Sequence, residues 1–266
     1  MVKPGVMATS VVYPFSKINL GLHVLEKRAD GFHNIETLFF PYSLCDILEI
    51  TDAEEGGSEG VQLFLYGLPV KGPAASNLCV KAYSLLLERF DLGPVEMHLY
   101  KQIPPGSGLG GGSSDAACCL HLLNKHFGLG LSTGELLEYA VRLGSDVPFF
   151  MQEGLVKPYL ATGKGEVLES FAVDLDAYRF ELRFPPVFVS TAEAYAGIVP
   201  EKNRTPLRDL LCQPVETWKD VLENDFEKVV FKKYPQVRQC KEDLYREGAV
   251  YAAMTGSGSA VFGLFR

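Results

Sequence analysis

The sequence predicts an α+β fold, because runs typical of strands and runs typical of helices are interleaved along the chain. The strand-like runs are short, rich in β-branched and apolar residues, and bounded by turn residues. The helical runs carry apolar residues three or four positions apart. With 266 residues, 47% hydrophobic and 22% charged, the chain is expected to form a globular protein of one large domain or two modest ones.

The beginning of the chain is rich in predicted strands. Strand-like runs lie at 11–25, 35–40, 46–52 and 61–67. Pro14 interrupts the first run, since proline lacks the N–H group that a strand ladder needs, and the turn-rich residues 26–34 follow it. The acidic, glycine-containing segment 53–60 predicts a solvated loop.

Helices dominate the next part of the chain. Apolar spacing predicts helices over 77–90, over 114–127 and from Ser132 to 143–144, with a half-buried strand at 95–103. Asn77 is placed to cap the first of these helices. Ser132 and Glu135 form the Ser-x-x-Glu capping box that opens the third.

The remainder again mixes both kinds of element. Strand-like runs lie at 156–162, 178–184 and 261–265, and helical runs at 191–198, in pieces over 205–234, and at 236–246. A glycine- and serine-rich loop at 255–260 precedes the last strand. No internal repeat is visible, and we expect a domain boundary near 150–155.

The charge balance argues against nucleic-acid binding. The chain has 25 lysines and arginines against 33 aspartates and glutamates, a formal net charge of −8. Such a chain is a poor general partner for polyanions, so any anionic ligand must be held by a local arrangement of groups. We expect no nucleic-acid partner.

The chain also lacks the signals of a membrane or secreted protein. No apolar stretch reaches the roughly 18–20 residues of a membrane helix, and residues 1–15 do not read as a signal peptide. The six cysteines include no Cys-x-x-Cys pair and the histidines no metal-ligand spacing. These features predict a cytoplasmic protein with reduced thiols, no membrane association, no disulfide framework and no metal-ligand set.

The segment 106–112 is the strongest functional signal, with glycine at five of its seven positions between a predicted strand and a predicted helix. Glycine allows positive φ and close approach of the backbone to a ligand. The first N–H groups of the helix are unpaired and lie at the positive end of its dipole. Together these features predict a phosphate site. The alternative is a mobile glycine-rich linker.

Two common phosphate motifs do not fit this segment. Gly106, Gly108 and Gly111 satisfy the Gly-x-Gly-x-x-Gly fingerprint, but a helix begins where the dinucleotide-binding fold needs a second strand and an acidic residue. The P-loop pattern Gly-x-x-x-x-Gly-Lys-Ser/Thr is absent. The segment therefore predicts a third type of phosphate loop.

Residues 104–116 (PPGSGLGGGSSDA) resemble the phosphate loop of the GHMP kinases, the small-molecule kinases grouped as galactokinase, homoserine kinase, mevalonate kinase and phosphomevalonate kinase. Three more segments narrow the resemblance to the 4-diphosphocytidyl-2-C-methyl-D-erythritol kinases. They are PFSKINLGLHVLEKRADGFHNIETLFF (14–40), GSDVPFF (144–150) and MTGSGSAVFG (254–263). The four segments occur in the family's order and span nearly the whole chain.

This resemblance implies a two-domain α+β GHMP kinase fold with the active site in the cleft between the domains. The expected domains are an N-terminal ATP-binding domain at 1–153 and a C-terminal domain at 154–266. The implied reaction is transfer of the ATP γ-phosphoryl group to the 2-hydroxyl of a cytidine-diphosphate-linked methylerythritol, a step of the non-mevalonate route to isoprenoid precursors. ATP is expected with Mg²⁺ and without a prosthetic group, in a monomer or homodimer.

Two other functions remain open at this stage. One is a sister kinase acting on mevalonate or homoserine, which leaves the motif Arg-Ala-Asp-Gly-Phe-His at 28–33 unexplained. The other is a non-catalytic nucleotide-binding module on the same fold. That second alternative would be favoured by the absence of Lys17 or Asp146, and both are present.

The resemblance assigns catalysis to Asp146 and Lys17. Asp146 is implied to orient the substrate hydroxyl and accept its proton, although an aspartate before Val-Pro also suits a turn or helix cap. Lys17 interrupts an apolar strand, where a charge is costly unless it is paired or faces a cleft. It is implied to stabilise the transferring phosphoryl group or to hold Asp146 ionised, the alternative being an outward-facing lysine.

The remaining implied site residues bind the two substrates. Those for ATP are Lys101, Pro104, Pro105, Gly106, Ser107, Gly108, Leu109, Gly110, Gly111, Gly112, Ser113 and Ser114. Lys101 is a candidate phosphate contact or else an ordinary exposed strand lysine. The loop 255–259 either brings more N–H groups to the ligand or is a plain β-turn.

For the second substrate, the implied residues are Asn19, Phe32, His33, Thr191 and Tyr195. His33 matches a histidine that hydrogen-bonds the cytosine, while Phe32 and Tyr195 match aromatic residues that stack on its two faces. Phenylalanine stands at 32 where the family has tyrosine. The alternative is that both aromatic residues belong to the core. Asn19 shares a strand face with Lys17 and is placed to orient the substrate hydroxyl.

Overall fold

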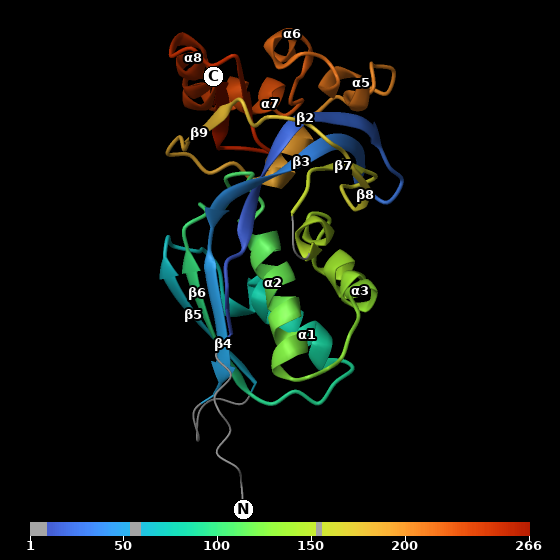
Figure 1. Ribbon diagram of the computed structural model, residues 1–266, viewed down its shortest axis with the longest axis vertical. Helices are drawn as coiled ribbons and strands as arrows, with labels where there is room; N and C mark the ends of the chain where they lie inside the picture. The colour runs from blue at the N-terminus through green and yellow to red at the C-terminus, as the bar shows by residue number, and fades with distance from the viewer. Residues whose placement is uncertain (1–9, 54–59, 153–155) are drawn as a thin grey trace, which may run out of the picture. The chain divides into compact units, whose positions relative to one another are not determined.

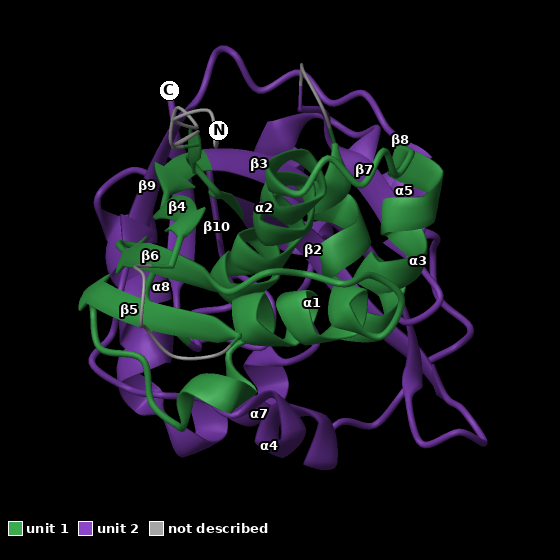
Figure 2. Cartoon of the chain, turned by 90° about the horizontal axis from the view of Figure 1, so that it is seen from below, with its two compact units in different colours: residues 1–16, 43–105, 110–154 green, residues 17–42, 106–109, 155–266 purple. Residues whose placement is uncertain are grey.

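The computed structural model describes residues 10–53, 60–152 and 156–266 (Figure 1). Its chain divides into two compact units (Figure 2). Unit 1 contains the described residues of 1–16, 43–105 and 110–154, and unit 2 those of 17–42, 106–109 and 155–266. The predicted boundary at 153/154 and most of the predicted loop at 53–60 lie outside the described residues, as do residues 1–9.

Unit 1 is built on a four-stranded sheet. Its strands, in sheet order, are β1 (Ser10–Val12), β4 (Ile47–Asp52), β6 (Val95–Lys101) and β5 (Val61–Gly67). The pairs β1–β4 and β4–β6 are antiparallel, whereas β5 runs parallel to β6. Buried and less buried residues alternate along β6, as expected for the predicted half-buried strand.

Helices supply the rest of the unit 1 core. They are η1 (Ala74–Ser76), α1 (Leu78–Leu87), α2 (Gly111–His126), α3 (Thr133–Leu143) and η2 (Val147–Met151). The three α-helices pack against one another, and α1 and α2 contact the sheet (Figure 1). Leu48 of β4, Met97 of β6 and Leu120 of α2 are among the fully buried residues. This packing fixes the end of β6 and the start of α2, which flank the glycine-rich segment.

Unit 2 contains two sheets and the remaining helices. One sheet has the order β2 (Phe15–Lys27), β3 (His33–Cys45), β7 (Tyr159–Thr162), β8 (Val167–Ser170), and the other β10 (Tyr251–Met254), β11 (Val261–Phe265), β9 (Arg179–Arg183). The helices are α4 (Thr191–Ala196), α5 (Leu207–Leu211), η3 (Val215–Thr217), α6 (Trp218–Val221), α7 (Glu227–Lys233) and α8 (Pro235–Arg246). Helix α8 packs on β10 and β11.

The local sequence signals are confirmed. The side chain of Asn77 caps α1 by accepting from the N–H of Cys79, and the capping box of Ser132 and Glu135 is formed at the start of α3. Helix α2 begins three residues before its predicted start at Ser114, because Gly110 at φ 74° caps it and Gly111 is already helical. The six cysteines are free in this structure.

Two short strands were not predicted. Strand β10 is an unbroken apolar run in which all four residues are buried, so it shows no alternation that would mark a strand. Strand β8 has only four residues. Within the part of the chain that is described, no helix combines the length and apolarity needed to cross a membrane.

Candidate active site

The first half of the glycine-rich segment, residues 106–109, lies in unit 2 and is firmly hydrogen-bonded. The carbonyl of Ser107 accepts from the N–H of Ala260 (3.0 Å), and the carbonyl of Leu109 accepts from the N–H of Lys17 (2.9 Å). Gly108 has φ 83°, and a Cβ atom there would lie 2.0 Å from the carbonyl oxygen of Thr255. Only glycine fits this approach, and a mobile linker would not make these bonds.

The second half, residues 110–112, forms the start of α2 in unit 1. Gly110 adopts φ 74°, and the N–H of Ser114 already donates to its carbonyl (3.0 Å). The N–H groups of the three preceding helical residues have no acceptor within the helix. A Cβ atom at Gly112 would meet no other atom within 4 Å, so the backbone there borders open space. N–H groups without a helical acceptor, at the positive end of a 16-residue helix, suit a phosphate.

Lys17 lies on β2 and is only 3% exposed, so the alternative of an outward-facing lysine is wrong. Its ammonium donates to the side-chain oxygen of Asn19 and to the carbonyl oxygen of Gly108 (2.8 Å). Both acceptors are neutral oxygens. The positive charge of Lys17 is therefore placed directly beside the glycine-rich segment.

Asn19 is held from both ends of its side-chain amide. Its oxygen is an acceptor for Lys17, and its nitrogen donates to the hydroxyl of Thr37 (2.9 Å). The N–H of Asn19 donates to the hydroxyl oxygen of Thr255 (3.0 Å). These bonds fix the orientation of Asn19, whereas its predicted contact with the substrate hydroxyl stays a prediction.

The loop 255–260 connects β10 to β11 as a hairpin. It contacts the glycine-rich segment, because the hydroxyl of Thr255 lies 3.3 Å from the carbonyl oxygen of Gly108. Asn224 supports the loop by donating to the carbonyls of Met254 (2.7 Å) and Gly256 (2.9 Å). Sequence reasoning missed Asn224, since its partners are about 30 residues away along the chain and no local motif marks such a contact.

Asp146 lies in unit 1 between α3 and η2. It occupies the residue before η2, yet its side chain makes no capping hydrogen bond to that helix. The side chain is half-buried. The alternative that Asp146 caps the helix through its side chain is therefore wrong.

The predicted base-binding residues lie in unit 2 with different neighbours from those expected. The ring of Tyr195 stacks on the imidazole of His33 (centroids 4.9 Å, 23° between planes) and packs edge-on against Phe226 (4.8 Å). Phe32 is 55% exposed, and the ammonium of Lys164 lies 4.7 Å from its ring centroid. Phe32 is thus no core residue.

The pKa of His33 and a hydroxyl contact of Thr191 complete the description of the predicted base-binding residues. Burial, with a smaller effect from the charge of Lys27, lowers the pKa of His33, which favours the neutral imidazole as both donor and acceptor. The hydroxyls of Thr191 and Ser257 are 3.0 Å apart. This contact links the start of α4 to the loop 255–260.

Among the predicted site residues, Lys101 has the surroundings that differ most from those expected. It is 4% exposed, so the alternative of an exposed strand lysine is wrong. Its ammonium is paired with the carboxylates of Asp46 and Asp115, both buried in unit 1. Neither carboxylate was among the predicted site residues.

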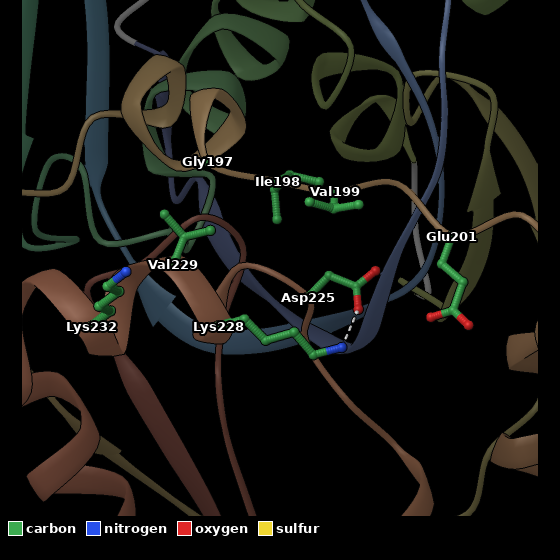
Figure 3. A pocket seen from close by; sticks show the side chains of 8 residues that line it. All are labelled: Gly197, Ile198, Val199, Glu201, Asp225, Lys228, Val229 and Lys232. Carbon is green, nitrogen blue, oxygen red and sulfur yellow. Dashed lines mark ion pairs between the residues drawn. The ribbon is translucent and has the colours of Figure 1, made fainter.

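Unit 2 also contains a cavity of about 400 Å³ (Figure 3). It is lined by Gly197, Ile198, Val199, Glu201, Asp225, Lys228, Val229 and Lys232. Lys228 is paired with Asp225 (3.6 Å) and with Glu223 (3.0 Å). No predicted site residue is among those that line it. Across the described ranges, no three His, Cys, Asp or Glu side chains are grouped in a way that would hold a metal ion.

Comparison with known proteins gives consistent matches. Residues 77–154 match the GHMP kinases N terminal domain, and residues 207–266 match the GHMP kinases C terminal domain. A Bacteroides thetaiotaomicron protein named 4-diphosphocytidyl-2-C-methyl-D-erythritol kinase is 48% identical over 96% of this chain and 92% of its own. A Cytophaga hutchinsonii protein of the same name is 47% identical over the same shares.

Solved structures agree with the sequence relatives. A crystal structure of 4-(cytidine 5'-diphospho)-2C-methyl-D-erythritol kinase superposes with a TM-score of 0.76 at 32% identity, over 96% of this chain and 90% of the other. An L. major mevalonate kinase has a TM-score of 0.62 at 17% identity, over 99% of this chain and 90% of the other, which shows a shared fold alone.

Proposed function

The chain belongs to the 4-diphosphocytidyl-2-C-methyl-D-erythritol kinases within the GHMP kinases, and on this premise we propose that it phosphorylates the 2-hydroxyl of 4-diphosphocytidyl-2-C-methyl-D-erythritol with ATP. The observation that carries the proposal is 48% identity over 96% of the chain to a protein named for this reaction. The reaction is a step of the non-mevalonate route to isoprenoid precursors.

The phosphates of ATP bind at the glycine-rich segment in this proposal. The N–H groups that open α2 have no acceptor within the helix, the backbone at Gly112 borders open space, and the helix dipole favours the negative charge of a phosphate. Ser107 and Leu109 are held by backbone hydrogen bonds, which support a preformed loop. Binding to a preformed loop avoids the free energy of ordering it.

Asp146 is the proposed general base. A carboxylate that accepts the proton of the attacking hydroxyl makes the oxygen a better nucleophile as the bond to the γ-phosphorus forms. The bond from that phosphorus to the bridging oxygen breaks at the same time, and ADP leaves. The match of the segment GSDVPFF (144–150) to the family's motif supports this role.

Lys17 is the proposed electrostatic partner of the transferring phosphoryl group. Its ammonium lies next to the carbonyl of Gly108 within the proposed phosphate loop. A fixed positive charge in a buried position stabilises the charge that develops in the transition state without needing to reorganise. Asn19 holds this ammonium in place through its side-chain oxygen.

His33 and Tyr195 are the proposed recognition residues for the cytosine, with Phe32 and Thr191 beside them. A neutral imidazole can both donate to and accept from the edge of a base, and an aromatic face offers stacking. The imidazole of His33 stacks on Tyr195 in this structure, so a base that stacks on that face of Tyr195 displaces the imidazole. The imidazole is then free to turn toward the edge of the base.

Mg²⁺ is proposed to accompany ATP. This ion usually retains several waters and is bound by substrate phosphates with one or two carboxylates, so it does not require a cluster of three protein ligands. When bound, it neutralises charge on the phosphates. A cytoplasmic location and a monomeric or homodimeric state are also part of the proposal.

A phosphotransfer assay tests this function directly. Purified protein with ATP and Mg²⁺ is offered the cytidylyl substrate, mevalonate and homoserine in parallel. We expect phosphorylation of the cytidylyl substrate alone. Preference for mevalonate or homoserine would assign a sister activity, and binding of ATP without any transfer would indicate a nucleotide-binding module.

A further inference from the structure

Three buried charged residues meet in unit 1, where β4, β6 and α2 come together. Asp46 directly precedes β4, Lys101 ends β6, and Asp115 lies in the first turns of α2. The ammonium of Lys101 donates to one carboxylate oxygen of Asp46 and to one of Asp115, the latter at 2.6 Å. All three side chains are almost fully buried.

Asp46 also binds the backbone that leads into the glycine-rich segment. Its other carboxylate oxygen accepts from the N–H groups of Gln102 (2.6 Å) and Ile103 (2.8 Å). The side chain of Ile103 in turn lies where a Cβ atom of Gly111 would be only 2.8 Å away. The network therefore connects the residues that enter the segment with the helix that follows it.

These contacts are difficult to reconcile with a direct role of Lys101 on phosphate. A phosphate would have to reach an ammonium that is 4% exposed and already donates to two carboxylates. Separating a buried ammonium from its carboxylate partners costs free energy, because the carboxylates would remain buried without a compensating charge. Charge-assisted hydrogen bonds of this kind instead fix geometry.

We propose that the Asp46–Lys101–Asp115 network is a positioning device that holds residues 102–103 and the start of α2 at a fixed separation. Lys101 then acts on ATP through the backbone of the segment and not as a phosphate ligand. The inference rests on the proposed function in one respect, namely that ATP binds at this segment.

The variant Asp46→Ala separates the two roles of Lys101, because they predict opposite effects on ATP affinity. The variant removes the acceptor for Gln102 and Ile103 but leaves the ammonium paired with Asp115, so no lone charge is buried. As a positioning device, the network loses its anchor, and the Kd for ATP rises at least 5-fold. As a phosphate ligand, Lys101 would be released and a negative charge removed, so the Kd would stay the same or fall.

The experiment has two readouts on purified protein, with Asp91→Ala, an exposed site of unit 1, as the matched control. Calorimetry measures the Kd for ATP. Hydrogen exchange without nucleotide measures the amides of residues 102–115, which we expect to exchange several-fold faster in Asp46→Ala and unchanged in the control. Asp46→Asn, which keeps an acceptor oxygen, should lie between the wild type and Asp46→Ala on both readouts.

The outcomes distinguish the inference from the proposed function. Unchanged exchange together with unchanged or tighter ATP binding in Asp46→Ala would overturn the positioning role. A wild-type protein that binds no ATP would instead overturn the proposed function, while the exchange readout would still decide the role of the network. If Asp46→Ala does not fold, Asp46→Asn decides by the same two criteria.

Discussion

The imidazole of His33 stacks on the ring of Tyr195, with the centroids 4.9 Å apart and the planes inclined by 23°. The two residues come from the start of β3 and from α4, and Tyr195 also packs edge-on against Phe226. A ligand that stacks on the face of Tyr195 covered by His33 must therefore displace the imidazole.

The first prediction concerns how the base is read. His33→Ala removes the edge-recognition group and uncovers Tyr195, so it should lower kcat/KM for the cytidylyl substrate and narrow its advantage over a uridylyl analogue. Stacking is worth about 1–3 kcal/mol per base and tolerates any base, so hydrogen bonds must supply the discrimination. The measurement is kcat/KM for both substrates.

Phe32 provides the control for that experiment. Phe32→Ala should weaken both substrates about equally, and Phe32→Tyr should be nearly neutral, because the exposed ring contributes stacking area without reading the base edge. The Kd for ATP should not change in any of these variants. A His33→Ala enzyme with its full cytidylyl preference would show that the base is read elsewhere.

The second prediction concerns the chemical step. Asp146→Asn is close in shape but cannot accept a proton, so kcat should fall by 10²-fold or more, as is typical for loss of a general base. The Kd for ATP should stay within a few-fold, because the phosphate loop is untouched. Steady-state kinetics and ATP calorimetry check the two parts separately. Turnover near that of the wild type would remove Asp146 from the mechanism.

The third prediction concerns Gly108 and separates steric overlap from backbone strain. Gly108→Ala carries the strain of a positive φ and a Cβ atom 2.0 Å from the carbonyl oxygen of Thr255. Gly130→Ala carries similar strain at φ 68°, but its Cβ atom would meet nothing within 4 Å. The control should lose about 1–2 kcal/mol of unfolding free energy. Gly108→Ala should lose clearly more and also weaken ATP binding.

Thermal and denaturant unfolding of both variants provide the measurement. Equal losses of stability would mean that the loop 255–260 yields to the added methyl group without cost. In that case the close contact between Gly108 and the loop 255–260 would not restrict which residue can occupy position 108. ATP calorimetry on the same proteins then shows whether the loop geometry matters for binding.

Local elements of this fold were predictable because their signals involve neighbouring residues. The cap of α1 needs only Asn77 and Cys79, and the capping box of α3 needs only Ser132 and Glu135. Each of these contacts spans at most three residues, so the sequence carries the whole interaction. The same holds for the glycine pattern that precedes α2.

The environments of the site residues were not predictable in this way. Lys101 and Asp46 are 55 positions apart, and His33 and Tyr195 come from distant parts of the chain. A lone lysine near the end of a strand gives no sign of two carboxylates that will surround it. The family pattern therefore identified which residues to examine, whereas their partners emerged only from the tertiary structure.

The last prediction concerns the pH dependence of stability, through Asp115. Burial, reinforced by the charge of Asp46 and only partly offset by Lys101, raises the pKa of Asp115 from 3.8 to about 7. The thiols of Cys79 and Cys118 also interact with Asp115. A hydrogen bond with Cys119, followed by burial, raises the pKa of Cys79, and burial raises that of Cys118. Since the folded state binds the proton more tightly than the unfolded chain, stability should fall as the pH rises from about 4 to about 7 and then level off.

Asp115→Asn removes this titration while preserving the shape of the side chain. Relative to that variant, the unfolding free energy of the wild type should fall by up to about 1.4 kcal/mol per pH unit between pH 5 and 7, the slope for one proton. Denaturant unfolding at pH 5, 6, 7 and 8 measures the difference. Asp91→Asn, at an exposed position, serves as the control, and its unfolding free energy should change with pH as that of the wild type does. Parallel curves for Asp115→Asn and the wild type would mean that Asp115 stays ionised throughout, with Lys101 fully compensating its charge.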